Sequence, residues 1–137
     1  MGRKRIKRDY VYAVGRRRTS IARVRLYKGK KENTVNGELI GKYFPGDVMR
    51  AFWEKPFKIA DLVGKYYVTI KVVGGGKRGQ LNAAVHGIAR ALSFSDTLKF
   101  RGLMKSAGLL TRDARKRQRR MVGSGGKSRR KKQSPKR

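Results

Sequence analysis

The residues in this sequence best suited to bind phosphate form a glycine-rich stretch with two cations: Gly74, Gly75, Gly76, Lys77 and Arg78. Glycine lacks a β-carbon, so the backbone of such a stretch can approach a partner closely. An apolar, strand-like run precedes the stretch at residues 66–73, and an amphipathic, helix-like run follows at residues 80–93. A helix start offers unpaired N–H groups and a partial positive charge, which suit an anion. The sequence therefore predicts a phosphate-binding junction between a strand and a helix.

The same stretch allows two other interpretations. Gly74, Gly76 and Gly79 have the spacing of the dinucleotide-binding fingerprint, with a strand before and a helix after. That site also needs a second strand that ends in an acid about 20 residues further on. Asp96 lies near that distance, but the residues before it continue a helical pattern. A flexible loop with solvated charges is the other alternative, whereas contact with the phosphate backbone of a nucleic acid explains both glycines and cations.

The charge of the chain points to a polyanionic partner. The 137 residues, enough for one domain, include 38 Lys and Arg against 8 Asp and Glu, a formal net charge of +30. Self-repulsion at this charge opposes compaction unless a polyanion neutralises it, and nucleic acid is the first candidate. A membrane surface is the second, but the sequence has no apolar run long enough to span a bilayer. Binding to a membrane surface would need an amphipathic basic helix, and the scattered glycines and the proline of the tail argue against one, so we expect no membrane partner.

Residue types that support catalysis or metal binding are scarce. His86 is the single histidine, and the eight scattered acids offer no paired carboxylates for acid–base chemistry. We expect His86 to be a packing residue or an RNA contact, and we expect no enzyme activity, cofactor, metal or small-molecule substrate. The chain has no Cys, which favours the cytoplasm, and its basic residues 1–8 lack the apolar segment of a signal peptide.

The pattern before the glycine stretch predicts strands with one basic face. A strand begins at residues 10–14, and a basic turn at residues 15–20 interrupts it. Residues 21–27 then alternate, so that Ala22, Val24 and Leu26 face a core while the other face carries Arg23, Arg25 and Tyr27. That second face suits a polyanion with exposed bases to stack. A solvated sheet surface is the alternative, although such a surface normally includes acids.

Helices are predicted on both sides of the junction. Asp47 can cap a helix over residues 48–54 with a buried stripe of Val48, Ala51 and Phe52, and Pro56 stops it. Apolar residues at spacings of three and four mark the helix at 80–93. A further helix starts at Ser95 or Asp96 and ends at Gly108.

The end of the chain has a different character. Residues 112–137 contain 13 Lys and Arg and one acid, Asp113, and too few apolar residues to fold alone. We expect three parts: a basic arm at 1–9, a compact domain at 10–110, and an extended basic tail at 111–137. The tail is interpreted as a segment that orders on nucleic acid, with a solubilising or targeting tail as the alternative.

Several blocks in a fixed order resemble one family, ribosomal protein number nine of the small subunit in its bacterial form. They are YAVGRRRTSIARV at 12–24, TVNG at 34–37, YFP at 43–45, GGGKRGQ at 74–80, HGIARAL at 86–92, AGLLTRDAR at 107–115 and PKR at 135–137. A general nucleoid or RNA-chaperone protein shares the charge but does not explain this ordered set of motifs. The terminus departs from the family, which usually ends in an aromatic followed by Ser-Lys-Arg, because Pro135 stands before Lys136 here.

The resemblance implies an α+β fold in which helices back a mixed sheet. This fold is similar to the second domain of small-subunit ribosomal protein number five, with a left-handed βαβ crossover and a long basic C-terminal extension. The general rule for such crossovers would predict the right-handed form. The resemblance also implies a structural constituent of the small ribosomal subunit in the cytoplasm that binds the 3′ major (head) domain of small-subunit rRNA.

The implied partners are small-subunit rRNA, the peptidyl-site tRNA and neighbouring ribosomal proteins of the subunit head. The tRNA contact falls on Lys136 and Arg137 at the end of the tail. The residues expected to contact rRNA are Arg16, Arg17, Arg18, Thr19, Arg23, Arg25, Gly74, Gly75, Gly76, Lys77, Arg78, Arg112, Arg115, Lys116, Arg117, Arg119, Arg120, Lys127, Arg129, Arg130, Lys131 and Lys132. The cations among them would neutralise phosphates and release counterions, while RNA shape supplies specificity.

Overall fold

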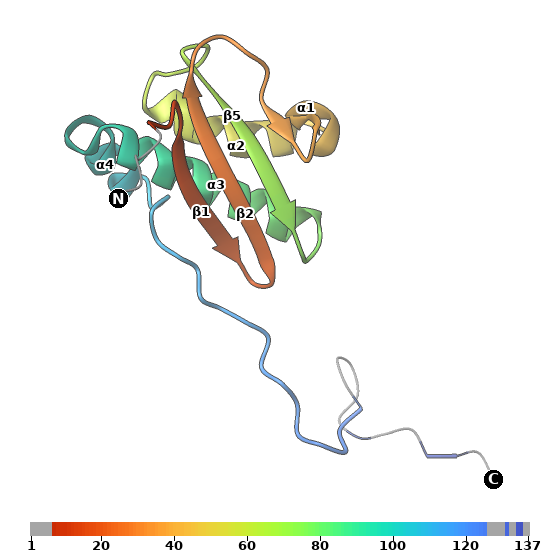
Figure 1. The fold of residues 1–137 in the computed structure, drawn as a ribbon. Helices are drawn as coiled ribbons and strands as arrows, with labels where there is room; N and C mark the ends of the chain where they lie inside the picture. The colour runs from red at the N-terminus through yellow and green to blue at the C-terminus, as the bar shows by residue number, and fades with distance from the viewer. Residues whose placement is uncertain (1–6, 126–130, 132–133, 136–137) are drawn as a thin grey trace, which may run out of the picture.

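A computed structural model describes residues 7–125, 131 and 134–135 as a sheet backed by helices, followed by an irregular tail. Its elements, in order, are β1 (Val11–Arg17), β2 (Ser20–Lys28), β3 (Thr34–Val35), β4 (Glu38–Leu39), α1 (Ile40–Tyr43), α2 (Asp47–Ile59), β5 (Tyr66–Val73), α3 (Lys77–Ser95) and α4 (Thr97–Ser106). Figure 1 views the sheet from its open face, with α2 and α3 behind the strands. The helices therefore cover one face and leave the other face uncovered.

The sheet is mixed. Its five strands lie in the order β1-β2-β5-β3-β4. β2 pairs antiparallel with both β1 and β5, whereas the short β3 pairs parallel with β5. Because α1 and α2 lie between β3 and β5 in the chain, these elements form a βαβ unit. The predicted α+β class with a mixed sheet and backing helices is confirmed.

Alternation in the long strands decides which side chains face the helices. Ala22, Val24 and Leu26 of β2 are buried, and Arg23 and Arg25 are exposed, as the sequence pattern predicts. β5 follows the same rule, with its inward-facing residues at positions 68, 70 and 72 buried. One face of each strand thus contributes to the core and the other to the open surface.

Helix α3 packs against β1 through two glycines. A β-carbon on Gly15 would lie 1.9 Å from the Ala83 carbonyl oxygen, and one on Gly87 would lie 2.6 Å from Val24 Cγ2. Contacts this short cannot exist, so the helix and the strand can approach each other only because both positions lack a side chain. The close approach buries α3 along most of its length, from Leu81 to Ser93.

The structure corrects three element boundaries. The expected basic turn at 15–20 shrinks to Arg18 and Thr19, because residues 15–17 remain in β1 and pair with β2. Helix α3 begins at Lys77, three residues before the predicted start. Helix α2 continues through Pro56 to Ile59, and its N-cap is Gly46, with no side-chain cap from Asp47.

The predicted buried stripe of α2 is wrong. The buried residues are Trp53, Pro56 and Phe57, whereas Val48 and Phe52 are 74% and 50% exposed. The burial of these three side chains offsets the backbone hydrogen bond that Pro56 cannot donate. Helix α4, the last helix of the described residues, follows its prediction: Asp96 caps it by accepting from the Lys99 N–H, and Gly108, with φ of 73°, follows its end.

Candidate nucleic-acid interface

The glycine stretch packs against the tip of the β1–β2 hairpin. A β-carbon on Gly74 would lie 2.5 Å from the Thr19 carbonyl oxygen, and one on Gly75 would lie 2.2 Å from Ser20 Oγ. The Ser20 hydroxyl donates to the Gly74 carbonyl oxygen at 3.0 Å. Two of the predicted phosphate-contacting glycines therefore have an intramolecular role, while Gly76 has open space at its Cα. The fold thus brings residues 16–19 and 74–78 together at one end of the sheet.

The two cations of the stretch lie in the first turn of α3, which contains no acid. Positive charge at a helix N-terminus is unfavourable, so this turn favours an added anion. Lys77 already has an internal partner: its Nζ donates to the Tyr43 carbonyl oxygen at 3.1 Å and lies 3.3 Å from the centre of the Tyr43 ring. Arg78 is exposed and is the cation of this turn more available to a ligand.

The first residues of the tail are attached to the same end of the sheet. Asp113 pairs with Arg17 at 3.0 Å and with Arg115 at 2.9 Å. Hydrogen bonds from Arg115, together with the charges of Arg115 and Arg17, hold the pKa of Asp113 well below its usual range. Arg17 also donates to the Arg115 carbonyl oxygen at 3.4 Å. Asp113 therefore stays charged and fixes the direction in which the tail leaves the domain.

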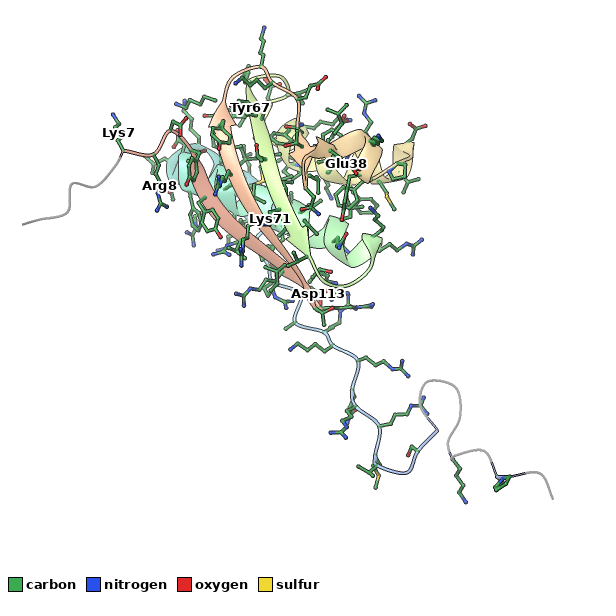
Figure 2. All side chains as sticks on the ribbon, turned by 45° about the vertical axis from the view of Figure 1, so that its right-hand side comes forward. Lys7, Arg8, Glu38, Tyr67, Lys71 and Asp113 are labelled. Atoms are coloured by element: carbon green, nitrogen blue, oxygen red, sulfur yellow. The ribbon has the colours of Figure 1, made fainter. Side chains whose placement is uncertain are left out.

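Five cations surround this attachment and line a hollow of about 600 Å³; they are Arg17, Arg18, Arg115, Lys116 and Arg117. We call this set the tail-root cluster. Asp113 is the one carboxylate that the described part of the chain places in an ion pair with the cluster. Figure 2 shows Asp113 where the strands end and the tail leaves the domain. The remaining positive charge suits phosphates of a polyanion.

The open face of the sheet carries a second basic surface. A groove of about 690 Å³ crosses β1, β2 and β5, and the exposed side chains that line it include Tyr12, Arg23, Arg25 and Lys71. We call it the sheet groove. Arg23 and Arg25 were predicted from alternation in β2. Lys71 was missed, although the same alternation in β5 places it on this face opposite Arg23.

Three tyrosines gather at the other end of the sheet; Tyr27 was predicted on this face, whereas Tyr10 and Tyr67 were missed. Tyr27 and Tyr67 stack at 5.0 Å, and Tyr10 packs on Tyr27 at 5.5 Å. Residues 27 and 67 are paired across β2 and β5, but only the strand register reveals this. Figure 2 places Tyr67 toward the end of the sheet opposite Asp113, with Lys71 between them.

The other predicted contacts lie along the tail. Residues 111–120 contain no helix or strand, and their chain leads away from the domain in Figure 1. Arg112 donates to the Asp113 carbonyl oxygen, and Arg119, Arg120 and Lys131 are exposed. Six predicted residues lie outside the described part of the chain: Lys127, Arg129, Arg130, Lys132, Lys136 and Arg137.

The described residues offer neither a membrane-spanning helix nor a metal site. None of their helices has the length and apolar character needed to cross a membrane. Within the same residues, no three His, Asp or Glu side chains gather as metal ligands would.

These surfaces and this fold define a small α+β protein that presents cations on an open sheet face and at the root of a basic tail. The chain belongs to the family described as ribosomal protein S9/S16, whose model it matches over residues 15–137. Curated relatives carry a description that agrees with this family. The chain is 42% identical over 121 residues to the small ribosomal subunit protein uS9 of Maridesulfovibrio salexigens, covering 88% of this chain and 92% of the relative.

Other relatives carry the same description. Identity is 41% over 118 residues with the small ribosomal subunit protein uS9 of Solidesulfovibrio magneticus, covering 86% of this chain and 90% of the relative. It is 47% over 111 residues with that of Leifsonia xyli subsp. xyli, covering 81% of this chain and 66% of the relative. Family membership makes the chain a structural, non-enzymatic constituent of the small ribosomal subunit, an rRNA-binding part of a cytoplasmic ribonucleoprotein in translation.

Proposed function

We propose that the folded part of the chain binds the 3′ major (head) domain of small-subunit rRNA, and that the tail reaches the peptidyl-site tRNA during translation. Neighbouring proteins of the subunit head complete its surroundings. The tail-root cluster carries the proposal, because it unites cations from the hairpin and the tail in one place. Its Arg17, Arg115 and Arg117 come from segments almost a hundred residues apart in the chain.

The division of the chain follows from the same contacts. We propose a basic arm at 1–9, a compact RNA-binding domain at 10–110 and a tail at 111–137. Residues Leu109 and Leu110 still pack on the core, whereas the exposed residues after Asp113 do not. This supports a boundary close to residue 110. The domain is further proposed to resemble the second domain of small-subunit ribosomal protein number five, with a left-handed crossover from β3 through α2 to β5.

The roles within the proposed function differ by segment. The tail-root cluster, Arg78 and the tail cations hold rRNA phosphates, which releases counterions and makes binding steeply salt-dependent. The end of the tail, Lys136 and Arg137, contacts the anticodon stem-loop of the tRNA. The resemblance to the family supports this last assignment. RNA shape supplies specificity, since phosphate contacts alone carry no sequence information.

The test compares two triple variants that remove equal charge. One changes Arg115, Lys116 and Arg117 of the tail-root cluster to Ala; the other changes Lys99, Arg101 and Lys105 of α4, all exposed, to Ala. Affinity for a 3′ major domain transcript is measured against salt, with chemical footprints on the bound RNA. For about 10 contacted phosphates, the wild-type log–log slope should be of order −7 to −9, and the cluster variant should lose about 2 to 3 units of it.

The α4 variant should keep the wild-type slope and footprint. Equal losses in both variants, or equal affinity for an unrelated RNA, would favour a protein that coats any polyanion. A wild-type slope near −2 would also contradict the proposed set of phosphate contacts.

A further inference from the structure

We infer that the sheet groove is a binding site for unpaired nucleotides of the RNA, with Tyr12 stacking on a base and Arg23, Arg25 and Lys71 holding the adjoining phosphates. The inference rests on the proposed function, since it names the kind of RNA structure that one part of the domain binds. It concerns the open face of the sheet and is independent of the tail-root cluster.

The charges of the groove call for an anion. Arg23 and Lys71 are directly opposite each other in the β2–β5 register, and both are exposed. Like charges in this position destabilise a sheet. The strands β1, β2 and β5 contain no Asp or Glu, and no ion pair among the described residues involves Arg23, Arg25 or Lys71. A phosphate between these cations would remove the repulsion.

Tyr12 supplies the stacking surface. It is 42% exposed, lines the groove and pairs across the sheet with Arg25. The described residues give it no ring or hydrogen-bond partner, in contrast to Tyr27, whose ring already stacks on Tyr67 and contacts Tyr10. The guanidinium of Arg25 lies 5.1 Å from the centre of the Tyr10 ring, which holds this cation beside the open ring of Tyr12.

The groove is large enough for nucleotides, and the Asn36 amide on its rim offers no hydrogen bond that would select one base over another. Its volume of about 690 Å³ falls within the roughly 300–1,000 Å³ typical of small-ligand pockets, enough for one or two nucleotides. Asn36 lies on the rim, but its amide is already used: the nitrogen donates to the Val72 carbonyl oxygen and the oxygen accepts from the Val72 N–H. The rim therefore shapes the site without offering that amide to a base.

Unpaired RNA fits this surface better than a duplex does. In a helix the base faces are stacked inside, and the deep major groove of A-form RNA is closed to side chains. An exposed ring flanked by cations instead matches the stacking platforms that bind single strands with little sequence preference. Because β1, β2 and β5 carry no acid, a ligand rich in phosphates is the natural occupant, and a protein segment is the competing one.

The test uses the full chain and two RNA probes. One is a single-stranded hexauridylate, and the other is a hairpin whose bases are all paired except the four of its tetraloop. Tyr12→Leu removes the stacking ring and keeps an apolar side chain, Tyr12→Phe keeps the ring, and Phe94→Leu removes another exposed ring, on α3. Tyr12→Leu should weaken hexauridylate binding about 5- to 160-fold, the usual effect of one stacked base. Tyr12→Phe and Phe94→Leu should bind it like the wild type, and duplex affinity should not change.

A second variant, Arg23→Gln, gives two readouts of opposite sign. It should raise the thermal midpoint of the free chain, because it removes the repulsion from Lys71, and it should weaken hexauridylate binding. The inference fails if Tyr12→Leu leaves hexauridylate affinity unchanged, or if it lowers single-strand and duplex affinity alike. Unchanged RNA affinity with poorer incorporation into small subunits would point to a protein occupant. If the tail-root variant still loses rRNA affinity in those cases, only this inference fails and the proposed function stands.

Discussion

The charge state of His86 is decided by the fold. Its Nδ1 accepts the Arg16 N–H at 3.3 Å, and its ring hydrogen-bonds the backbone of Leu110. Burial is the main cause that lowers its pKa; the charges of Arg90 and Arg112 lower it further, and the Leu110 contact raises it in part. The ring is therefore neutral and links β1, α3 and Leu110, just before the tail. Of the two roles expected from the sequence, this geometry favours packing.

A pH dependence of stability follows from this histidine. In the unfolded chain the pKa of His86 is about 6.5, above its value in the folded chain. At pH values near and just below 6.5, the unfolded state therefore binds more protons than the folded state. The free energy of unfolding should therefore fall as the pH drops from about 7 to 5. Urea unfolding across this range measures it, and His86→Asn, which keeps an acceptor, should flatten the dependence. An equal slope in wild type and variant would show that another group is responsible.

At the scale of elements, the contact between α3 and β1 depends on Gly15. A methyl group there would meet the Ala83 carbonyl oxygen and the Gly87 nitrogen at 1.9 and 2.3 Å, and both are backbone atoms that cannot rotate away. Gly15→Ala should therefore destabilise the domain by at least the ~1–3 kcal/mol typical of overpacking. The denaturant midpoint reports the change.

Gly102→Ala is the matched control, because Gly102 lies within α4 and a β-carbon added there would meet open space. It should leave stability unchanged or raise it by up to about 1 kcal/mol through helix propensity. Equal stability of Gly15→Ala and wild type would mean that α3 can move away from the sheet without loss.

Local periodicity was sufficient for part of the fold. The strand at 66–73, the inward face of β2 and the buried positions of α3 follow patterns of two or of three and four residues, and all are confirmed. The extension of α2 through Pro56 could not be predicted, because burial of Trp53 and Phe57 against the core outweighs a local stop signal. Likewise, the hairpin that explains Gly74 lies more than fifty residues away in the chain.

The candidate site divides in the same way. Arg23 and Arg25 follow from alternation within one strand, and the basic tail follows from composition. The contacts between distant residues could not be predicted in this way. Lys71 lies opposite Arg23 because of the strand register, and Asp113 pairs with Arg17 because of the path of the tail. The contact between Lys77 and the Tyr43 ring could not be predicted either, because it joins α3 to the end of α1.

At the scale of the whole molecule, the sequence divides the positive charge between the residues up to 111 and the basic residues after them. Residues 112–137 carry 13 cations and one acid, a net charge of +12 out of +30. Residues 112–120 form no helix or strand, so the cations of this stretch are not packed together, which lowers their mutual repulsion. Asp113 compensates charge at the point where the sheet and residues 113–117 meet, which favours an ordered attachment among the cations there.

A division of labour along the tail is therefore expected. Deletion of Lys136 and Arg137 leaves the tail-root cluster intact, so small subunits should incorporate the shortened chain as well as the full one. Peptidyl-site tRNA should dissociate roughly 5- to 30-fold faster, if each lost cation contributes about 0.5–1 kcal/mol to its binding. Lys99→Ala with Arg101→Ala removes the same charge from α4 and should leave the tRNA dissociation rate unchanged. Purified subunits carrying each variant are compared by protein content and tRNA release. Failure of the shortened chain to enter subunits, or equal tRNA release from both variants, would contradict a separate tRNA contact at the tail end.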